Sequence, residues 1–179
     1  MLIQLIRRAK YLISNGIELA ATPSFGVLLK NSSAVFWQNQ SDYLHHFAAI
    51  DDHDIWASIK FWQYHPDKVL SLLSTMLLER KLFKADLANE PFAEEENQHI
   101  VMQLLQKYAV EPTEISYLFT NGTISNAAYV DNEEKIWIKK KNGEVIDIVK
   151  ASDLPSIEAL SKSVTKFYRC YPKLIKKPL

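Results

Sequence analysis

The sequence predicts an α+β protein, with an N-terminal all-helical segment followed by a small α+β lobe that has a mainly antiparallel sheet. Three observations predict this class. Before residue 80, apolar residues recur at spacings of three and four, which is typical of helices. After residue 80, several short segments alternate apolar and polar residues, which is typical of strands. Asn142-Gly143 separates two such segments and is a strong signal for an antiparallel hairpin.

Two helices are expected at the start of the chain. Residues 2–13 carry one apolar stripe. Asn15-Gly16 should end this helix, because glycine suits a left-handed C-terminal cap. A second, shorter helix should open at Thr22-Pro23, since proline is favoured in the first helical turn. Its inward-facing residues are predicted to be Phe25, Leu28 and Leu29.

Three further helices are expected before residue 80. Ser41-Asp42 begins the third helix, and Pro66-Asp67 begins the fifth, "DKVLSLLSTMLLER". The third is predicted to form around Tyr43, Leu44 and Phe47. The fourth is predicted to run from about Asp52 to Tyr64.

The second part of the chain should combine strands with two helices. Glu94 to Tyr108 is predicted to be a helix, and its acidic first turn suits the positive end of the helix dipole. Ser152 to Ser161 is predicted to be a short helix. The predicted strands are "KLFKADL", "ISYLFTNG", "KIWIKKKNG", "VIDIVKA" and "SVTKFYRCY". We therefore expect a helical segment at 1–79, an α+β lobe at 80–174 and a basic tail at 175–179.

Composition narrows the classes of protein. The longest apolar runs are far below the roughly 18 residues of a membrane span, so no membrane partner is expected. The single cysteine, Cys170, excludes an internal disulfide and favours a cytoplasmic location. The net charge is zero, but residues 135–179 hold eleven Lys/Arg and four Asp/Glu, a net charge of +7. This excess is compatible with a nucleic-acid-binding module, although a solvated lysine-rich surface is the preferred interpretation.

The stretch "HHFAAIDDHD" at residues 45–54 contains the residue types of a metal-dependent phosphohydrolase. A stand-alone enzyme of this kind would use His53 and Asp54, together with other histidines, as metal ligands. We prefer another interpretation, in which Asp51 or Asp52 caps the following helix and Asp54 interacts with its dipole. Adjacent residues on a helix point about 100° apart, so the pair would need ligands from other elements.

Other candidate residues also have a structural explanation. Lys139, Lys140 and Lys141 precede the hairpin turn and could bind phosphate, but a charged turn is the commoner case. Cys170 lies in a predicted strand without a matching His and Asp pattern, so it is not expected to be a nucleophile. Four aromatic residues could stack a nucleobase but are expected to be core residues instead. They are Trp56, Phe61, Trp62 and Tyr64.

Three cations lie at the junction of the fifth helix and the first strand, in "ERKLFK" at residues 79–84. If this segment is a strand from its start, Arg80 and Lys84 share a face and can bind one anion together, whereas Lys81 points to the opposite face. The alternative is that these cations are ordinary solvent-exposed side chains at the edge of the sheet.

The segment "DDHDIWASIKFWQYHPDKVLSLLSTMLLERKLFK" resembles a region of HD-domain phosphohydrolases of the deoxynucleoside triphosphate triphosphohydrolase type. "RRAKYLISNGIELAATPSF", "SNAAYV" and "LSKSVTKFYRCYPK" are similar to flanking regions of that family. The family takes its metal ligands, a His, a His-Asp pair and a distant Asp, from helices that precede the region resembled here. The resemblance therefore implies a C-terminal, non-catalytic portion, with no catalytic residues and no metal ligands.

The resemblance also implies a role for this portion. Members of the family form oligomers, and in some of them a nucleotide bound between subunits regulates activity. Their R-x-LFK element supplies cations to that site and corresponds to Arg80 and Lys84 here. The expected partners are a second copy of the chain or the catalytic portion, and a nucleotide. No cofactor is expected in this chain, because the divalent metal would belong to the catalytic portion.

Overall fold

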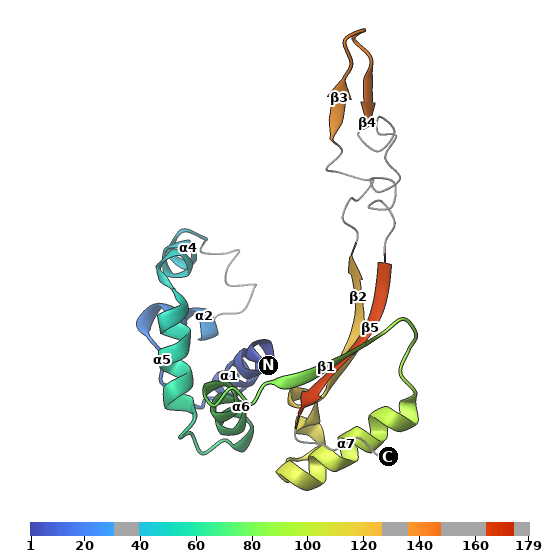
Figure 1. Ribbon diagram of the computed structural model, residues 1–179. Helices are drawn as coiled ribbons and strands as arrows, with labels where there is room; N and C mark the ends of the chain where they lie inside the picture. The colour runs from blue at the N-terminus through green and yellow to red at the C-terminus, as the bar shows by residue number, and fades with distance from the viewer. Residues whose placement is uncertain (31–39, 127–135, 148–163, 174–179) are drawn as a thin grey trace. The chain divides into compact units, whose positions relative to one another are not determined.

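The computed structural model describes residues 1–30, 40–126, 136–147 and 164–173. The α+β class is confirmed, since helices precede antiparallel sheets (Figure 1). Contacts group the chain into two compact units. The first comprises Met1–Ala85, Ala93–Thr120 and the residues from Cys170 onward, and the second comprises Asp86–Phe92 and Asn121–Arg169. The expected division at residue 79 stays a prediction. The predicted helix at Ser152–Ser161 and the basic tail lie outside the described residues.

The first two helices follow the predicted pattern. Helix α1 spans Leu2–Ser14 and ends at a C-cap on Asn15, followed by Gly16 with a φ of +80°. Its buried apolar residues are Leu5, Ala9 and Leu12. Helix α2 spans Pro23–Lys30 and buries Phe25, Leu28 and Leu29 as expected.

Three more helices follow, and side-chain caps define two of them. Helix α4 spans Gln40–Ala49, α5 spans Asp52–Trp62 and α6 spans Lys68–Leu78. Asp51 caps α5 in a capping box with Asp54, and Asp67 caps α6 by accepting from the backbone N–H of Leu70 at 2.8 Å. The caps provide acceptors for first-turn amides that have no partner within the helix.

Helix α7 spans Glu94–Tyr108, the predicted range. A 3-10 helix, η1, spans Pro112–Tyr117, where the sequence had predicted the start of a strand. Pro112 fixes a helical φ at the first position, and Glu111 and Glu114 form a capping box. These local signals turn the segment into a helix before the strand begins at Thr120.

The core of the first unit is made by α1, α2, α5, α6, α7 and η1, with the end of the last strand. Its most completely buried side chains include Leu5, Ile59, Leu70, Leu73, Leu104 and Leu118. Trp62 fills the centre as well, and its indole N–H donates to the carbonyl of Ala20 at 2.7 Å. None of the helices that the structure describes is long and apolar enough to cross a bilayer.

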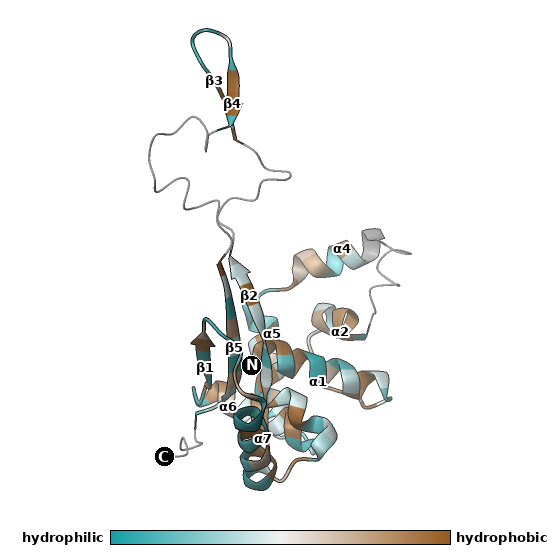
Figure 2. Ribbon diagram, turned by 90° about the vertical axis from the view of Figure 1, so that its right-hand side faces the viewer, coloured by the Kyte–Doolittle hydropathy of each residue, from teal (hydrophilic) through white to brown (hydrophobic). Residues whose placement is uncertain are grey.

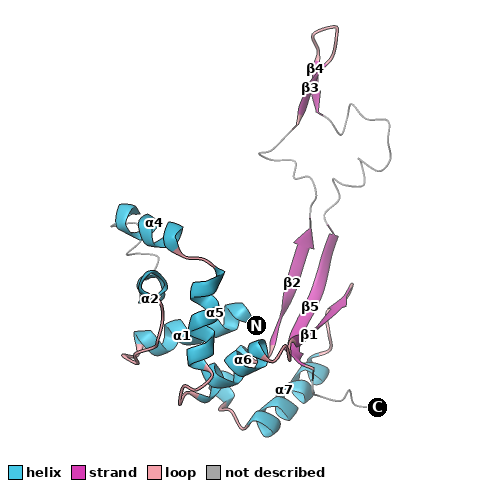
Figure 3. Cartoon of the chain, turned by 60° about the vertical axis from the view of Figure 1, so that its left-hand side comes forward, coloured by secondary structure: helices cyan, strands magenta, loops and turns pink. Residues whose placement is uncertain are grey.

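The strands form two separate sheets among the described residues, rather than the one sheet expected (Figure 3). The strands are β1 (Phe83–Ala88), β2 (Thr120–Asn126), β3 (Trp137–Lys139), β4 (Val145–Asp147) and β5 (Val164–Pro172). One sheet has the order β1-β5-β2, so the last strand in the sequence lies at its centre. The longest strand thus pairs on both sides.

The second sheet is the predicted hairpin. β3 and β4 pair antiparallel, with Ile138 opposite Ile146. Gly143 has a φ of +87°, a conformation that favours glycine, and the N–H of Lys140 donates to the carbonyl of Glu144 at 2.8 Å. In Figure 2 the tip of this hairpin is hydrophilic and β4 is hydrophobic.

Candidate functional site

The junction between α6 and β1 contains the two predicted phosphate-binding cations. After α6, the N–H of Arg80 donates to the carbonyl of Leu77 at 3.1 Å and the N–H of Lys81 donates to that of Met76 at 2.8 Å. These two bonds form a Schellman motif, whose left-handed position is usually a glycine. Arg80 occupies that position with a φ of +56°. A residue with a Cβ pays about 1 kcal/mol for this conformation.

The predicted strand geometry at Arg80 is wrong. β1 begins at Phe83, so Arg80 lies in the turn before the strand and the alternation of faces does not apply to it. The reason is that the Schellman motif satisfies the last carbonyls of α6 before the chain can extend. The Arg80 side chain is exposed at this turn. Its predicted role in phosphate binding is not tested by this geometry and stays a prediction.

Lys84 is the second residue of β1 and is half-buried. Its ammonium lies 3.5 Å from the hydroxyl oxygen of Tyr171 and 5.7 Å from the centre of that ring. Tyr171 is buried and its ring lies 6.4 Å from that of Phe119 in a stacked arrangement. Lys81, in contrast, is exposed and pairs with Glu79 at 2.6 Å. The aromatic wall at Lys84 thus holds one cation in a defined place beside the junction.

The His53-Asp54 pair has the geometry of a helix start. The carboxylate of Asp51 accepts from the backbone N–H of His53 at 2.7 Å and from that of Asp54 at 3.2 Å. The carboxylate of Asp54 accepts from the N–H of Asp51 at 2.8 Å. The preferred interpretation of this stretch as a helix cap is therefore confirmed at Asp51. Among the described residues, no group of three or more His, Cys, Asp or Glu side chains could hold a metal ion.

The expectation that four aromatics form a core cluster is wrong for three of them. Trp62 is buried, but Trp56, Phe61 and Tyr64 are exposed. The buried face of α5 is instead made by Ser58, Ile59 and Trp62. Since α5 has one buried stripe only, the other aromatic residues lie outside it.

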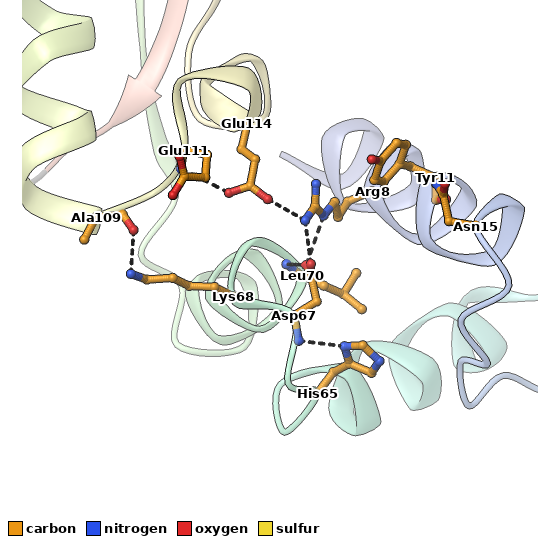
Figure 4. A network of polar contacts seen from close by, with 10 residues as sticks. All are labelled: Arg8, Tyr11, Asn15, His65, Asp67, Lys68, Leu70, Ala109, Glu111 and Glu114. Atoms are coloured by element: carbon orange, nitrogen blue, oxygen red, sulfur yellow. Dashed lines mark hydrogen bonds and ion pairs between the residues drawn. The ribbon is translucent and has the colours of Figure 1, made fainter.

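A buried charged network lies in the first unit and was not predicted from the sequence (Figure 4). The guanidinium of Arg8, on α1, donates through Nε to Oδ1 of Asp67 at 3.0 Å and through a terminal nitrogen to the other oxygen of that carboxylate. The same terminal nitrogen donates to Oε1 of Glu114 at 2.6 Å. One cation thus joins the start of α6 and the 3-10 helix to α1.

The electrostatic interactions of this network stabilise the fold. Burial disfavours the charged form of Asp67, but hydrogen bonds from Arg8 and from the N–H of Leu70 outweigh it and hold the pKa of Asp67 below its ordinary value. Burial also opposes the charge of Arg8, but the hydrogen bond to Asp67 and the negative charges of Asp67 and Glu114 act together against it, so the pKa of Arg8 is raised. Tyr11 and Tyr117 each place a ring centre 5.2 Å from the guanidinium carbon. The sequence signal was an arginine within the apolar stripe of α1.

The second unit has its own buried cation. Arg169 on β5 lies 3.3 Å from a carboxylate oxygen of Asp86 on β1, and its guanidinium carbon lies 4.1 Å from the ring centre of Phe92. This contact links neighbouring strands of the three-stranded sheet.

Two other candidate residues can be placed. At the hairpin turn, Lys140 pairs with Glu144 at 3.2 Å, as expected of a charged turn. Cys170 is a half-buried free thiol on β5.

These elements define an α+β protein whose buried charges hold helices and strands together. A solved structure of similar fold is the crystal structure of a phosphohydrolase from Bacteroides thetaiotaomicron VPI-5482, with 36% sequence identity and a TM-score of 0.80. The match covers 96% of this chain and 43% of that chain, so this chain spans less than half the length of the phosphohydrolase. The chain is thus a relative of a phosphohydrolase. No protein-family model and no curated protein sequence matches it.

Proposed function

We propose that this chain serves as a non-catalytic, regulatory portion of an HD-type nucleotide phosphohydrolase, which binds nucleotide phosphates through Arg80 and Lys84 and contributes to oligomerisation. The likeness across 96% of the chain to a phosphohydrolase of more than twice its length supports this proposal most strongly. Since no group of described residues fits a metal ion, we assign no hydrolytic step to this part of the chain.

The chemistry of the junction supports phosphate binding. A guanidinium binds phosphate through two parallel hydrogen bonds, and an ammonium adds a compact positive charge. Arg80 adopts a left-handed backbone conformation that costs about 1 kcal/mol more for arginine than for glycine. An arginine at such a position is consistent with a functional role for its cationic side chain. Lys84 is held against Tyr171, which limits the conformations that it would lose on binding an anion.

Calorimetric titration of the chain with dGTP and GTP tests the proposal. We compare the unaltered chain with Arg80→Gly and Lys84→Met. Arg80→Gly removes the cation while it keeps the left-handed turn, and Lys84→Met keeps an apolar stem beside Tyr171. Loss of a charge-assisted contact of about 1.5–3 kcal/mol predicts a Kd weaker by roughly 10- to 100-fold for each variant.

Lys81→Ala is the matched control, because Lys81 is a neighbouring exposed cation that already pairs with Glu79. Its Kd should stay within about twofold of the unaltered chain. The proposal is wrong if neither nucleotide binds at millimolar concentration. It is also wrong if the Kd is the same for the unaltered chain, Arg80→Gly and Lys84→Met.

A second candidate, a nucleic-acid-binding module, is favoured by the net charge of +7 in residues 135–179. Phosphate contacts made by such a segment would release counterions, so binding would weaken steeply with salt. Fluorescence anisotropy with single- and double-stranded oligonucleotides, at salt concentrations from about 50 to about 200 mM, measures this dependence. It decides between a nucleic-acid-binding module and a nucleotide-binding portion. Strong, salt-steep binding without nucleotide binding would favour the module.

A further inference from the structure

Three of the four glycines of this chain follow an asparagine, at Asn15-Gly16, Asn121-Gly122 and Asn142-Gly143. An asparagine side chain reacts most readily with the next backbone nitrogen when the next residue is glycine, because glycine has no Cβ to obstruct the approach. All three asparagines are exposed. The three pairs are therefore chemically alike, and they differ in how firmly the backbone around them is held.

The reaction is a deamidation that consumes only water. The backbone nitrogen of the glycine bonds to Cγ of the asparagine, the bond from Cγ to Nδ2 breaks, and the proton of the glycine nitrogen leaves with Nδ2 as ammonia. Water then opens the succinimide ring at one of its two carbonyl carbons. The products are aspartate and isoaspartate, whose main chain runs through Cβ and Cγ. Either product carries a negative charge that asparagine lacks.

The pair Asn15-Gly16 is held at the end of a packed helix. Nδ2 of Asn15 donates to the carbonyl of Tyr11 at 2.7 Å, and the N–H of Gly16 donates to that of Ile13 at 3.0 Å. Leu12, in the same turn, is buried in the core of the first unit. The nitrogen of Gly16 can attack only when this end of α1 unwinds, which disturbs the core.

The pair Asn121-Gly122 is held in the three-stranded sheet. Both residues belong to β2, which pairs with the central strand β5. Gly122 packs closely against Tyr168 of β5, since a Cβ on Gly122 would lie 3.2 Å from the ring of Tyr168. Ring closure requires β2 to leave its extended conformation, and therefore its place in the sheet.

The pair Asn142-Gly143 is held by hydrogen bonds within the hairpin turn. The N–H of Gly143 donates to the carbonyl of Lys140 at 2.9 Å, and Oδ1 of Asn142 accepts from the N–H of Glu144 at 3.1 Å. The strands β3 and β4 that flank this turn have three residues each and form a sheet of two strands. A two-stranded hairpin is only marginally stable, so this turn opens more often than α1 or the three-stranded sheet.

We propose that Asn142 is a site of spontaneous deamidation, which lowers the positive charge of the hairpin tip and weakens its attraction for polyanions. The tip, residues 139–144, holds three lysines and one glutamate, a net charge of +2 that falls to +1 in the product. The modification concerns neither Arg80 nor Lys84. The nucleotide titration therefore has no bearing on it, and its failure would leave the proposed function intact.

The turn itself also changes in the product. Hydrogen bonds from Lys140 and from the side-chain nitrogen of Asn142 hold the pKa of Glu144 below its ordinary value. Deamidation replaces the second donor by a carboxylate, which repels Glu144. Isoaspartate in addition lengthens the main chain between Lys140 and Glu144, whose backbone groups are paired at 2.8 Å.

Parallel incubation of the 179-residue chain at neutral pH, folded in buffer and unfolded in guanidinium chloride, tests the site. Cleavage after glutamate places the three pairs in separate peptides, at residues 1–18, 115–133 and 135–144. Mass spectrometry with fragmentation then measures the deamidated fraction at each asparagine. The three pairs should react at similar rates in the unfolded chain. In the folded chain, Asn142 should keep a rate within about threefold of this value, whereas Asn15 and Asn121 should slow at least about tenfold.

Heparin chromatography of Asn142→Asp tests the effect on the tip. Asn89→Asp is the matched control, because Asn89 is exposed, lies outside the hairpin and gives the same net charge. Asn142→Asp should elute at a lower salt concentration than Asn89→Asp. The site is refuted if Asn142 reacts as slowly as Asn15 and Asn121 in the folded chain. The effect on polyanion binding is refuted if the two variants elute at the same salt concentration.

Discussion

Replacement of Arg8 by methionine tests the buried network most directly. Methionine fills a similar volume, but it leaves Asp67 and Glu114 without their shared cation. The side chains of Arg8, Asp67 and Glu114 are 8%, 13% and 21% exposed, so water cannot fully replace the lost bonds. Breaking a buried pair by removing one partner costs about 3–5 kcal/mol. We expect a loss of about this size in the free energy of unfolding at pH 7.

Urea denaturation followed by far-UV circular dichroism and tryptophan fluorescence measures the loss. Two variants calibrate it. Asp67→Asn keeps both an acceptor for Arg8 and a good N-cap for α6, so it should cost only about 1–2 kcal/mol. Lys81→Ala breaks an exposed pair with Glu79 and should cost under about 1 kcal/mol. If Arg8→Met lowers the free energy of unfolding as little as Lys81→Ala does, the buried network does not stabilise the fold as argued.

The pH dependence of the free energy of unfolding tests whether the interaction of Arg8 with Asp67 is stabilising. The pKa of Asp67 is lowered in the folded protein, so its contribution is present above the unfolded value of about 4 and is lost as pH falls through the lower folded value. Without Arg8, the buried carboxylate of Asp67 loses its cation and lies near that of Glu114, so the pKa of Asp67 should rise instead. Arg8→Met should therefore be less destabilising near pH 4.5 than at pH 7, and the opposite trend would contradict the argument.

Three other substitutions test single features. Arg80→Gly should stabilise the protein by about 1 kcal/mol, because glycine adopts the left-handed turn without strain, and a lower midpoint in urea would show that the Arg80 side chain supports the fold. Asp51→Ala should cost about 1 kcal/mol by removing the cap of α5, whereas Asp52→Ala should have little effect in the same assay. Gly122→Ala should cost about 1 kcal/mol, because the new Cβ would lie 3.2 Å from the ring of Tyr168, and Tyr168→Ala in the same chain should relieve this clash in a double-mutant cycle.

Local signals predicted most of the elements correctly. The starts of α2, α5 and α7, the end of α1 at Asn15 and the hairpin turn at Gly143 each depend on residues that are close in sequence. The strand predicted from Ile115 was wrong at its start for a related reason. There the helical signal of Pro112 and Glu114 outweighed the alternation of apolar residues.

The candidate site was predicted less completely. Arg80 and Lys84 were singled out because they lie four residues apart in one motif, and their role in phosphate binding stays a prediction. The conformation of Arg80 could not be predicted, since most left-handed caps are marked by glycine. The exposure of Trp56 and Phe61 could not be predicted either, because a helix wheel shows two apolar sides and does not say which of them the rest of the chain covers.

The sequence by itself determined the α+β class, the positions of most helices and most of the segments able to form strands, because these follow from periodicity and from caps within a few residues. Only the tertiary structure decided that β5 lies between β1 and β2 and that Arg8 joins Asp67 and Glu114. Such contacts join residues as far as 106 positions apart. Their partners are selected by the packing of the whole unit, which no local pattern encodes.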